Sequence, residues 1–352
     1  MRPLKFGVTE FNQSFAFPSF TLFAPSGGSQ CFLIDMLGEC RKEWTLPGPL
    51  GNYGQLLPNG NLLITVRTSE GPKFNPIGGH ILEIDWDGDI IWEHIDHLQH
   101  HDFNRLPNGN TTYLSWELIP TEDAEIIGGV AGSEHTDGGI YYDVLREVNA
   151  DGDMVWEWRM VDHFPFEKYP LRPARPREEY AHANCCFVQP DGNILVSWRD
   201  IDLIALIDRE SGEFLWEMQD RRWGGQHDPR QLDNGNITLF ANGSEQVGPE
   251  YSRVLEIDPN KKEIVWSYQG TPVDTFFSPR VSGAQRLPNG NTFICEGRQG
   301  RLFEVNMSGE IVWEFISPHL NERADGITRQ IFRALKYGPA TEEIAGRVTL
   351  TR

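Results

Sequence analysis

The chain has 352 residues, of which 39% are hydrophobic and 23% are charged. This composition supplies a packed core and excludes global disorder, and the length predicts one or two domains. With 31 basic and 51 acidic residues, the formal net charge is −20. Because binding to a phosphate backbone requires a basic surface, we expect no nucleic acid partner.

Membrane and export signals are not evident in the sequence. No apolar stretch approaches the ~20 residues that a membrane helix needs, and the N-terminal residues lack the apolar core of a signal peptide. We therefore expect a soluble, cytoplasmic protein with no membrane partner. The five cysteines are odd in number and include no CxxC pair, so we expect reduced thiols and no structural zinc site.

A repeat runs along the whole chain. Each copy has an apolar strand, a polar turn and a second strand that ends in tryptophan. The six tryptophans that mark the copies are Trp44, Trp92, Trp156, Trp216, Trp266 and Trp313. Most of the turns carry Asp-Gly or Ser-Gly, which favours a β-hairpin in each copy. Because the tryptophans recur at one position of the repeat, we expect them to pack between neighbouring repeats.

A second hairpin alternates with the first. Five turns of the type Asn/Asp-Gly-Asn are each followed by an apolar strand, and they occupy residues 57–61, 106–110, 189–193, 232–236 and 287–291. Two hairpins per repeat make a four-stranded antiparallel sheet, and six such sheets predict an all-β, six-bladed β-propeller. Because one tryptophan unit lacks such a turn, we expect one blade to be closed by strands from both ends of the chain.

The domain prediction is a single propeller over residues 1–352. Longer insertions near residues 118–141 and 160–180 are candidate lids over one end of the propeller. The tail, residues 318–352, contains apolar residues at helical spacing between Ile327 and Leu335, so we expect a short C-terminal helical segment that packs on the propeller.

Polar residues recur at one register of the repeat. Counting back seven residues from the Asn or Asp before each turn glycine gives Asn52, His101, Asn184, His227 and Ser282. In a propeller this register begins the innermost strand, so these side chains and the nearby His182 should meet at one mouth of the central channel. Two histidines with different roles can act there as nucleophile and proton exchanger.

Positive charge is expected close to these histidines. Arg199 lies on the strand that returns from the 189–193 turn, and Arg221, Arg222 and Arg230 surround His227 in the sequence. A cationic site in an acidic protein suits a small anionic group. We expect a structural role for Asp102 and Asp228, which follow His101 and His227.

These residues resemble the arylsulfotransferase family. The resemblance is carried by residues 100–110, by His182-Ala183-Asn184 with Arg199, and by Gln226-His227-Asp228, and it spans roughly residues 50–340. The segment Ile331-Phe332-Arg333-Ala334 and Tyr337 also resemble the C-terminal end of that family. It implies transfer of sulfate from an aryl sulfate ester to a phenol through a sulfohistidine intermediate, without PAPS and without a cofactor.

The resemblance also implies roles for individual residues. His227 is then the nucleophile and His101 exchanges the proton, while His182, Asn184 and Arg199 bind the sulfuryl oxygens. Tyr180 and Trp223 are close in sequence to this set, and we expect them to face an aromatic acceptor.

Two other functions fit the same residues. In the first, His101, His182 and His227 hold Zn²⁺, Mn²⁺ or Fe²⁺ in a metal-dependent lyase or hydrolase. In the second, the propeller is a binding platform with a polar channel and no activity. Arg199 beside His182 favours an enzyme, because a scaffold gains nothing from a desolvated cation at the channel mouth.

Overall fold

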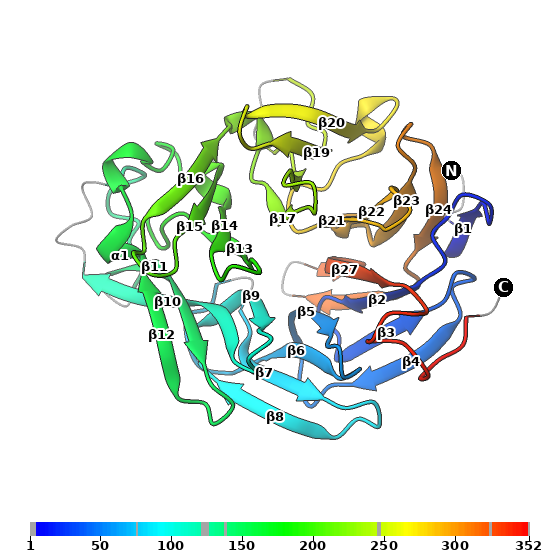
Figure 1. Cartoon of the computed structure of the whole chain (residues 1–352). Coiled ribbons are helices and arrows are strands. Elements are labelled where there is room, and N and C mark those ends of the chain that lie inside the picture. The colour runs from blue at the N-terminus through cyan, green and yellow to red at the C-terminus, as the bar shows by residue number, and fades with distance from the viewer. Residues whose placement is uncertain are drawn as a thin grey trace.

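The computed structural model describes residues 5–74, 77–120, 127–136, 139–244, 248–323 and 326–350. In this part of the chain, six antiparallel sheets stand around a central axis as the blades of a propeller (Figure 1). Each blade has four strands, and the sixth blade has a fifth strand at its outer edge. The all-β, six-bladed propeller predicted from the repeat is therefore confirmed.

The first three blades each begin with an innermost strand at the axis and end with a strand at the rim. From the axis outwards, blade 1 contains β27 (Ile331–Tyr337), β2 (Phe20–Pro25), β3 (Gln30–Ile34) and β4 (Cys40–Thr45). Blade 2 contains β5 (Leu50–Leu56), β6 (Leu62–Arg67), β7 (Gly79–Ile84) and β8 (Ile90–Ile95). Blade 3 contains β9 (Gln99–Arg105), β10 (Thr111–Pro120), β11 (Gly139–Val148) and β12 (Met154–Arg159).

The second half of the ring follows the same order. Blade 4 contains β13 (Ala183–Val188), β14 (Ile194–Trp198), β15 (Leu203–Ile207) and β16 (Phe214–Gln219). Blade 5 contains β17 (His227–Gln231), β18 (Ile237–Ala241), β19 (Arg253–Asp258) and β20 (Glu263–Gln269). Blade 6 contains β21 (Gly283–Arg286), β22 (Thr292–Glu296), β23 (Arg301–Val305), β24 (Ile311–Ile316) and β1 (Gly7–Phe11).

Two strands from opposite ends of the chain close the ring. The C-terminal strand β27 pairs antiparallel with β2 and becomes the innermost strand of blade 1, with Phe20 opposite Tyr337. At the other closure, β1 pairs with the outer edge of β24. The prediction that one blade is built from both chain ends is confirmed by blade 1.

The predicted C-terminal helix is wrong. The segment forms the hairpin of β25 (Asn321–Arg323) and β26 (Gly326–Thr328), and then β27. In the described residues the only α-helix is α1 (Met160–His163), and short 3-10 turns lie at 166–168, 199–201, 221–223, 273–275 and 297–299. Ile331, Phe332 and Ala334 are all buried because both faces of an innermost strand are covered. Because both faces are buried, this strand lacks the alternation of apolar and polar residues that marks a half-exposed strand. Its apolar residues therefore have a spacing that also fits a helix.

The six repeat tryptophans connect each blade to the next. Every one lies on the fourth strand of its blade, and its indole Nε1 donates to a backbone carbonyl in the outer hairpin of the following blade, at 2.8–3.2 Å. The last of these bonds runs from Trp313 to Met36 and completes the circle. Trp44 and Trp313 are buried, whereas the other four are half-buried. The predicted packing between blades is thus confirmed, with exposure at four of the six positions.

The Asn/Asp-Gly-Asn turns contribute a second set of links. In blade 5, Gly235 has a φ of +84°, which a glycine adopts without strain, and the Asn236 amide donates to Glu256 at 2.7 Å. Glu256 in turn pairs with Arg286 of blade 6 at 2.6 Å. Blades 2, 3 and 6 repeat this arrangement through Glu83, Glu147 and Glu304.

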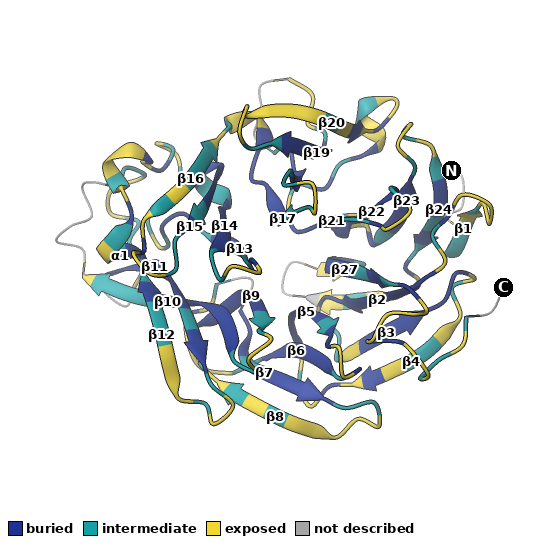
Figure 2. Ribbon diagram, viewed as in Figure 1, coloured by how far each residue is buried: buried dark blue, intermediate teal, exposed yellow. Residues whose placement is uncertain are grey.

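Burial follows the radius of the ring. Figure 2 shows dark blue inner strands, yellow residues concentrated on β8 and β20 at the rim, and a mostly teal β16. The insertion predicted at 160–180 packs against blades 3 and 4 through Phe164, Tyr169 and Leu171, which are buried. The insertion predicted at 118–141 extends the β10–β11 hairpin, and its residues 121–126 and 137–138 lie outside the described residues.

Two smaller expectations concern cysteines and membranes. None of the five cysteines forms a disulfide, and Cys40 alone among them is exposed. Within the described residues, no helix has both the length and the apolar character required to cross a membrane.

Candidate active site

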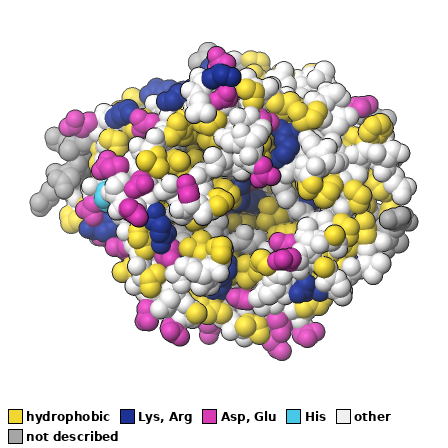
Figure 3. All heavy atoms as spheres, viewed as in Figure 1, with side chains coloured by type: hydrophobic (Ala, Val, Ile, Leu, Met, Phe, Trp, Pro, Cys, Tyr) yellow, Lys and Arg dark blue, Asp and Glu magenta, His cyan; other side chains and the backbone are white. Residues whose placement is uncertain are grey.

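A cavity of about 540 Å³ lies on the propeller axis where the inner strands begin. His101 of blade 3, His182 before blade 4 and His227 of blade 5 line it together with Arg199 and Asn52. Figure 3 shows the ring in space-filling form, hollowed at its centre with basic and hydrophobic side chains in the hollow. The predicted meeting of the three histidines at one mouth of the channel is therefore observed.

The backbone is locally left-handed where it presents these side chains. His101 has a φ of +47°, His182 a φ of +58° and Asp228 a φ of +54°. At two of these positions the ladder to the next strand skips residues, between His100 and Phe103 and between His227 and Arg230. Such bulges redirect a side chain, and non-glycine residues in this region cost on the order of 1–3 kcal/mol each. The fold therefore accepts strain at His101 and His182, which line the cavity, and at Asp228, which follows His227.

His227 is held in a single tautomer. Its Nδ1 lies 2.7 Å from the Asn242 side-chain oxygen and 3.0 Å from the Gly225 carbonyl, both of which only accept hydrogen bonds. The Asn242 amide nitrogen donates to two backbone carbonyls, of Ser278 and Val281, which fixes the direction of that amide. The proton of His227 is therefore on Nδ1 and the lone pair is on Nε2. Burial and the nearby Arg199 charge hold the pKa of His227 well below its usual value.

His101 lies between two other imidazoles. Its ring centre is 4.6 Å from that of His182, with the planes near perpendicular, and its Nδ1 lies 2.8 Å from Nδ1 of His100. The pKa of His101 is lowered by burial and then by the neighbouring His182, His100, His227 and Arg199. The lowered pKa favours a neutral imidazole at His101, whose Nδ1 is within hydrogen-bond distance of the His100 ring.

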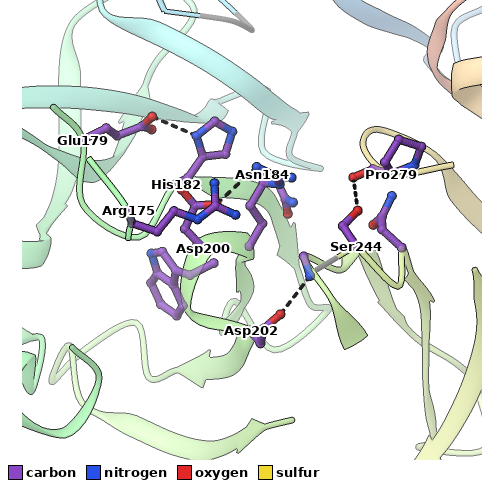
Figure 4. Close-up of polar contacts among 12 residues, drawn as sticks. Arg175, Glu179, His182, Asn184, Asp200, Asp202, Ser244 and Pro279 are labelled. Atoms are coloured by element: carbon purple, nitrogen blue, oxygen red, sulfur yellow. Dashed lines mark hydrogen bonds and ion pairs between the residues drawn. The ribbon is translucent and has the colours of Figure 1, made fainter. Parts of the chain in front are cut away.

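His182 is oriented by a carboxylate that the sequence did not single out. Its Nδ1 lies 2.8 Å from Glu179 Oε2, as Figure 4 shows. The other oxygen of Glu179 accepts the indole N–H of Trp116 at 2.9 Å. The carboxylate therefore accepts the Nδ1 proton of His182 and fixes the direction of the ring.

Arg199 places its guanidinium beside the backbone that precedes His227. Its Nη1 donates to Asp200 at 3.1 Å, and Asp200 also pairs with Arg175 at 3.4 Å (Figure 4). The Nε of Arg199 is buried and has no hydrogen-bond partner in the described residues. A Cβ at Gly225 would lie 3.4 Å from that Nε, so glycine lets the guanidinium approach the backbone. A buried donor without a partner is suited to an anionic ligand.

The cavity is cationic although the protein is acidic. Four arginines, Arg67, Arg199, Arg280 and Arg298, line it with the three histidines, and its described lining residues include no carboxylate. The sequence predicted Arg199 and missed the other three, which occupy loops and strand ends with no shared register. This arrangement favours a small anion of the sulfate or phosphate type.

Three arginines predicted near His227 do not contribute to this charge. Arg221 and Arg222 are exposed, and Arg222 pairs with Asp220. Arg230 pairs with Asp228 and lies over the Phe187 ring, where it lines a different cavity at the opposite end of β17. Arg221 and Arg222 lie in the 3-10 turn at 221–223, and Arg230 lies beyond the register shift that follows His227, so proximity in sequence misled the prediction.

Other predicted residues lie behind the cavity surface. Asn184 is fully buried and its amide donates to the Gln226 carbonyl at 2.7 Å, which supports the backbone next to His227. Ser282 is also buried, and its hydroxyl donates to Ser278. The expectation that Tyr180 and Trp223 face an aromatic acceptor is wrong, because both are core residues with at most 1% exposure. The aromatic ring that does line the cavity is Phe332 of β27.

A buried arginine joins β9 and β17 below the cavity. Arg333 of β27 contacts Asp102 through Nη1 and Asp228 through Nε, each at 3.0 Å. Arg333 is 1% exposed and stacks 4.4 Å above Tyr53, whose hydroxyl also donates to Asp102. The predicted structural role of the two aspartates is confirmed. Their arginine was missed because its segment was expected to be helical.

The alternative of a three-histidine metal site finds no support in this geometry. Over the described ranges, no three His, Cys, Asp or Glu side chains are grouped so that they could hold one metal ion. His101 and His182 instead make a perpendicular ring contact, and His227 turns its Nδ1 proton away from them.

Comparison with known proteins gives one family and a shared fold. The family model described as Arylsulfotransferase (ASST) matches residues 54–318, which is most of the chain. No curated protein matches it. A crystal structure of a protein of unknown function from Bacteroides caccae is similar over 91% of this chain and 98% of its own, with 15% identity and a TM-score of 0.57. A streptogramin B lyase structure covers 94% and 98%, with 12% identity and a TM-score of 0.49. At these identities, the Bacteroides structure shows only that the fold is shared.

Proposed function

Because this chain belongs to the arylsulfotransferase family, we propose that it transfers a sulfuryl group from an aryl sulfate to a phenol through a covalent adduct on His227. The observation that carries this proposal is the tautomer of His227, whose Nδ1 proton is bound by Asn242 and Gly225. A neutral imidazole with a free Nε2 lone pair is a competent nucleophile near neutral pH. PAPS is not needed, since the aryl sulfate is itself the donor.

The transfer divides into two half-reactions. In the first, Nε2 of His227 attacks the sulfur, the bond between sulfur and the aryl oxygen breaks, and the leaving phenolate takes a proton from His101. In the second, His101 accepts the proton of an incoming phenol, whose oxygen attacks the sulfur and breaks the N–S bond. The atoms and charges balance without a metal or an organic cofactor, so we propose neither. A proton transfer by a positioned group typically raises the reaction rate about 10²–10⁴-fold.

We assign the binding of the sulfuryl oxygens to the basic side chains that line the cavity. Arg199 offers its unpartnered Nε from the β14 side, and the His182 ring is held in place by Glu179. Hydrogen bonds from such groups strengthen as charge develops on the oxygens. For Asn184 we propose an indirect part, since its amide holds the Gln226 carbonyl beside His227. Phe332, whose ring centre is 6.0 Å from that of His101 and 6.4 Å from that of His227, supplies a face for an aromatic substrate.

The test is covalent trapping on the metal-stripped protein. After incubation with 4-nitrophenyl sulfate, mass spectrometry should find one added sulfuryl group on a peptide containing His227. The His227→Ala variant should lack the adduct and the release of 4-nitrophenol. His97→Ala is the matched control, because that ring lies outside the cavity and pairs with Glu70 at 3.5 Å. Release of a product only after addition of Mn²⁺ or Zn²⁺, without any adduct, favours the metal-dependent lyase or hydrolase instead.

A further inference from the structure

Two buried groups behind His101 have no part in the two half-reactions of the proposed transfer. The His100 ring stacks on Trp116 at 4.1 Å between ring centres and is 0% exposed. One of its nitrogens, Nδ1, lies 2.8 Å from Nδ1 of His101. The other, Nε2, lies 3.4 Å from Oδ1 of Asp143 on β11. A chain of polar atoms therefore leads from the cavity, through His101 and His100, to a buried carboxyl group.

The two facing atoms of the last link lack a well-formed hydrogen bond. Among the described residues, His100 Nε2 and Asp143 Oδ1 are both buried and meet no partner at good hydrogen-bond geometry. The Ser115 backbone lies near enough to His100, and the Trp198 indole near enough to Asp143, to act on their pKa values. Asp143 is 1% exposed, and its second oxygen accepts the backbone N–H of Ala183 at 3.0 Å. Buried polar atoms are rarely left unpaired, because each costs about 1–3 kcal/mol. One shared proton between this nitrogen and this oxygen satisfies both.

We infer that His100 and Asp143 store the proton that His101 exchanges between the two half-reactions; this inference rests on the proposed sulfuryl transfer. In the acid form, Asp143 O–H donates to His100 Nε2, His100 Nδ1–H donates to His101 Nδ1, and His101 carries its proton on Nε2. When the leaving phenolate takes the Nε2 proton of His101, the proton on His100 Nδ1 moves to His101 Nδ1. The proton on Asp143 then moves to His100 Nε2. Asp143 ends as a carboxylate, and both imidazoles stay neutral.

The acceptor half-reaction reverses these movements. The phenol proton goes to His101 Nε2, the Nδ1 proton of His101 goes to His100, and the Nε2 proton of His100 goes to Asp143. The active site thus keeps one proton per cycle and exchanges none with solvent. His100 and Asp143 do not line the cavity and are closed to water, so the proton stored behind His101 is kept from solvent.

The electrostatic surroundings agree with a protonated Asp143 at rest. Burial raises the pKa of Asp143, and the nearby carboxylates Glu179 and Asp200 raise it further. Burial lowers the pKa of His100, and His182 lowers it further. Both effects favour the neutral acid and the neutral imidazole over an ion pair. At rest, Asp143 is therefore protonated, and His101 carries on Nε2 the proton that it donates to the leaving phenolate.

The test uses donors that differ in their need for a proton. Poor leaving groups such as phenolate must be protonated as they depart, whereas 4-nitrophenolate leaves readily without it. The rate of adduct formation on His227 is measured with a series of aryl sulfates between these two. For Asp143→Asn, which keeps the shape but holds no transferable proton, we expect a loss of about 10²-fold with phenyl sulfate, within the usual range for general acid catalysis. The loss with 4-nitrophenyl sulfate should be severalfold at most.

Two further variants separate the proton store from a structural role. His100→Asn retains a polar atom near the Nδ1 position and removes the link to Asp143, so it should show the same dependence on leaving group. It also serves if Asp143→Asn does not fold. Glu256→Gln is a matched change of a buried carboxylate between blades 5 and 6. In this variant the rate of adduct formation should depend on the leaving phenol as it does in the wild type.

The outcomes distinguish this inference from the proposed function. If wild-type protein forms no His227 adduct with any donor, sulfuryl transfer is wrong and the proton store is rejected with it. If the adduct forms and Asp143→Asn loses the same factor with every donor, the proton store alone is overturned. A loss that grows steadily with the pKa of the leaving phenol supports it.

Discussion

The sequence repeat is kept at the outer strands of this propeller and is broken at the inner strands. At the rim, six tryptophans make the same bond to the next blade, so one interaction is used six times. At the axis, the corresponding positions carry different residues, among them Asn52, His101, His227 and Ser282. Repeated positions build the ring, and the positions where the repeat is broken form the cavity.

The two regions also differ in backbone strain. Each outer hairpin has one register shift in its pairing, the rim strands are half-exposed, and their tryptophan bonds are ordinary N–H to carbonyl contacts. The axis contains left-handed residues at His101, His182 and Asp228, and fully buried ion pairs on Arg333. Changes at the rim should therefore affect stability alone, whereas changes at the axis should affect activity, or stability and activity together.

The largest effect on stability is expected for Arg333→Met. The change leaves Asp102 and Asp228 buried without their shared cation, which typically costs about 3–5 kcal/mol of unfolding free energy. Denaturation by urea measures it, with Arg286→Met, an ion pair nearer the surface, as the milder control. A loss below ~1 kcal/mol would mean that Tyr53 and Arg230 suffice to compensate the two carboxylates.

The next effect should appear in activity alone. Arg199→Gln removes the donor expected to bind the sulfuryl oxygens, and a donor of this kind is worth about 10²–10³-fold in turnover. The free energy of unfolding should change little, because the side chain lines the cavity and, within the described part of the chain, its hydrogen bond goes to the adjacent Asp200. Arg222→Gln, at a side chain that is 77% exposed, is the control. Equal kcat/KM in the two variants would contradict the assignment of Arg199.

The pH dependence tests the tautomer of His227. Its pKa is lowered by burial and by Arg199, so the nucleophile stays neutral as the pH falls through the ordinary histidine value of about 6.5. The rate of adduct formation from 4-nitrophenyl sulfate should be flat there and fall about tenfold per pH unit only below the lowered pKa. A fall in rate centred at pH 6.5 or above would contradict the lowered pKa of His227. Arg199→Gln removes one of the charges that lower this pKa, so the rate should begin to fall at a higher pH than in the wild type.

The smallest effect is expected at the rim. Trp216→Phe keeps most of the ring contact but removes the bond from Nε1 to the Pro259 carbonyl, which measures 2.8 Å. One such hydrogen bond contributes about 1 kcal/mol to stability. Thermal or chemical unfolding should detect this loss, and turnover at a temperature well below unfolding should match the wild type. Reduced turnover without reduced stability would remove the distinction between rim and axis.

Sequence reasoning was most successful where the repeat constrained it. Tryptophan spacing and turn chemistry predicted six four-stranded blades, and a shared register predicted that His101 and His227 face one cavity. It failed at β27, because a strand covered on both faces loses its alternation of apolar and polar residues. That error also concealed Phe332 and Arg333, which complete the cavity wall and its base.

The remaining site residues could not be found by spacing. Asn242 and Glu179 act by fixing one ring each, and Arg67, Arg280 and Arg298 come from different blades and loops. Each is one polar residue among many in the sequence, with no periodic neighbour to single it out. Their contribution depends on which atoms face one another, and this is decided by the closing of the ring.

The sequence by itself determined the number of blades, the strand that carries each histidine and the acidic surface, because these follow from local pattern and composition. Only the tertiary structure decided which nitrogen of His227 is free, which cations surround it and which buried groups lie behind His101. The physical reason is that hydrogen-bond direction and desolvation depend on atoms brought together from distant parts of the chain.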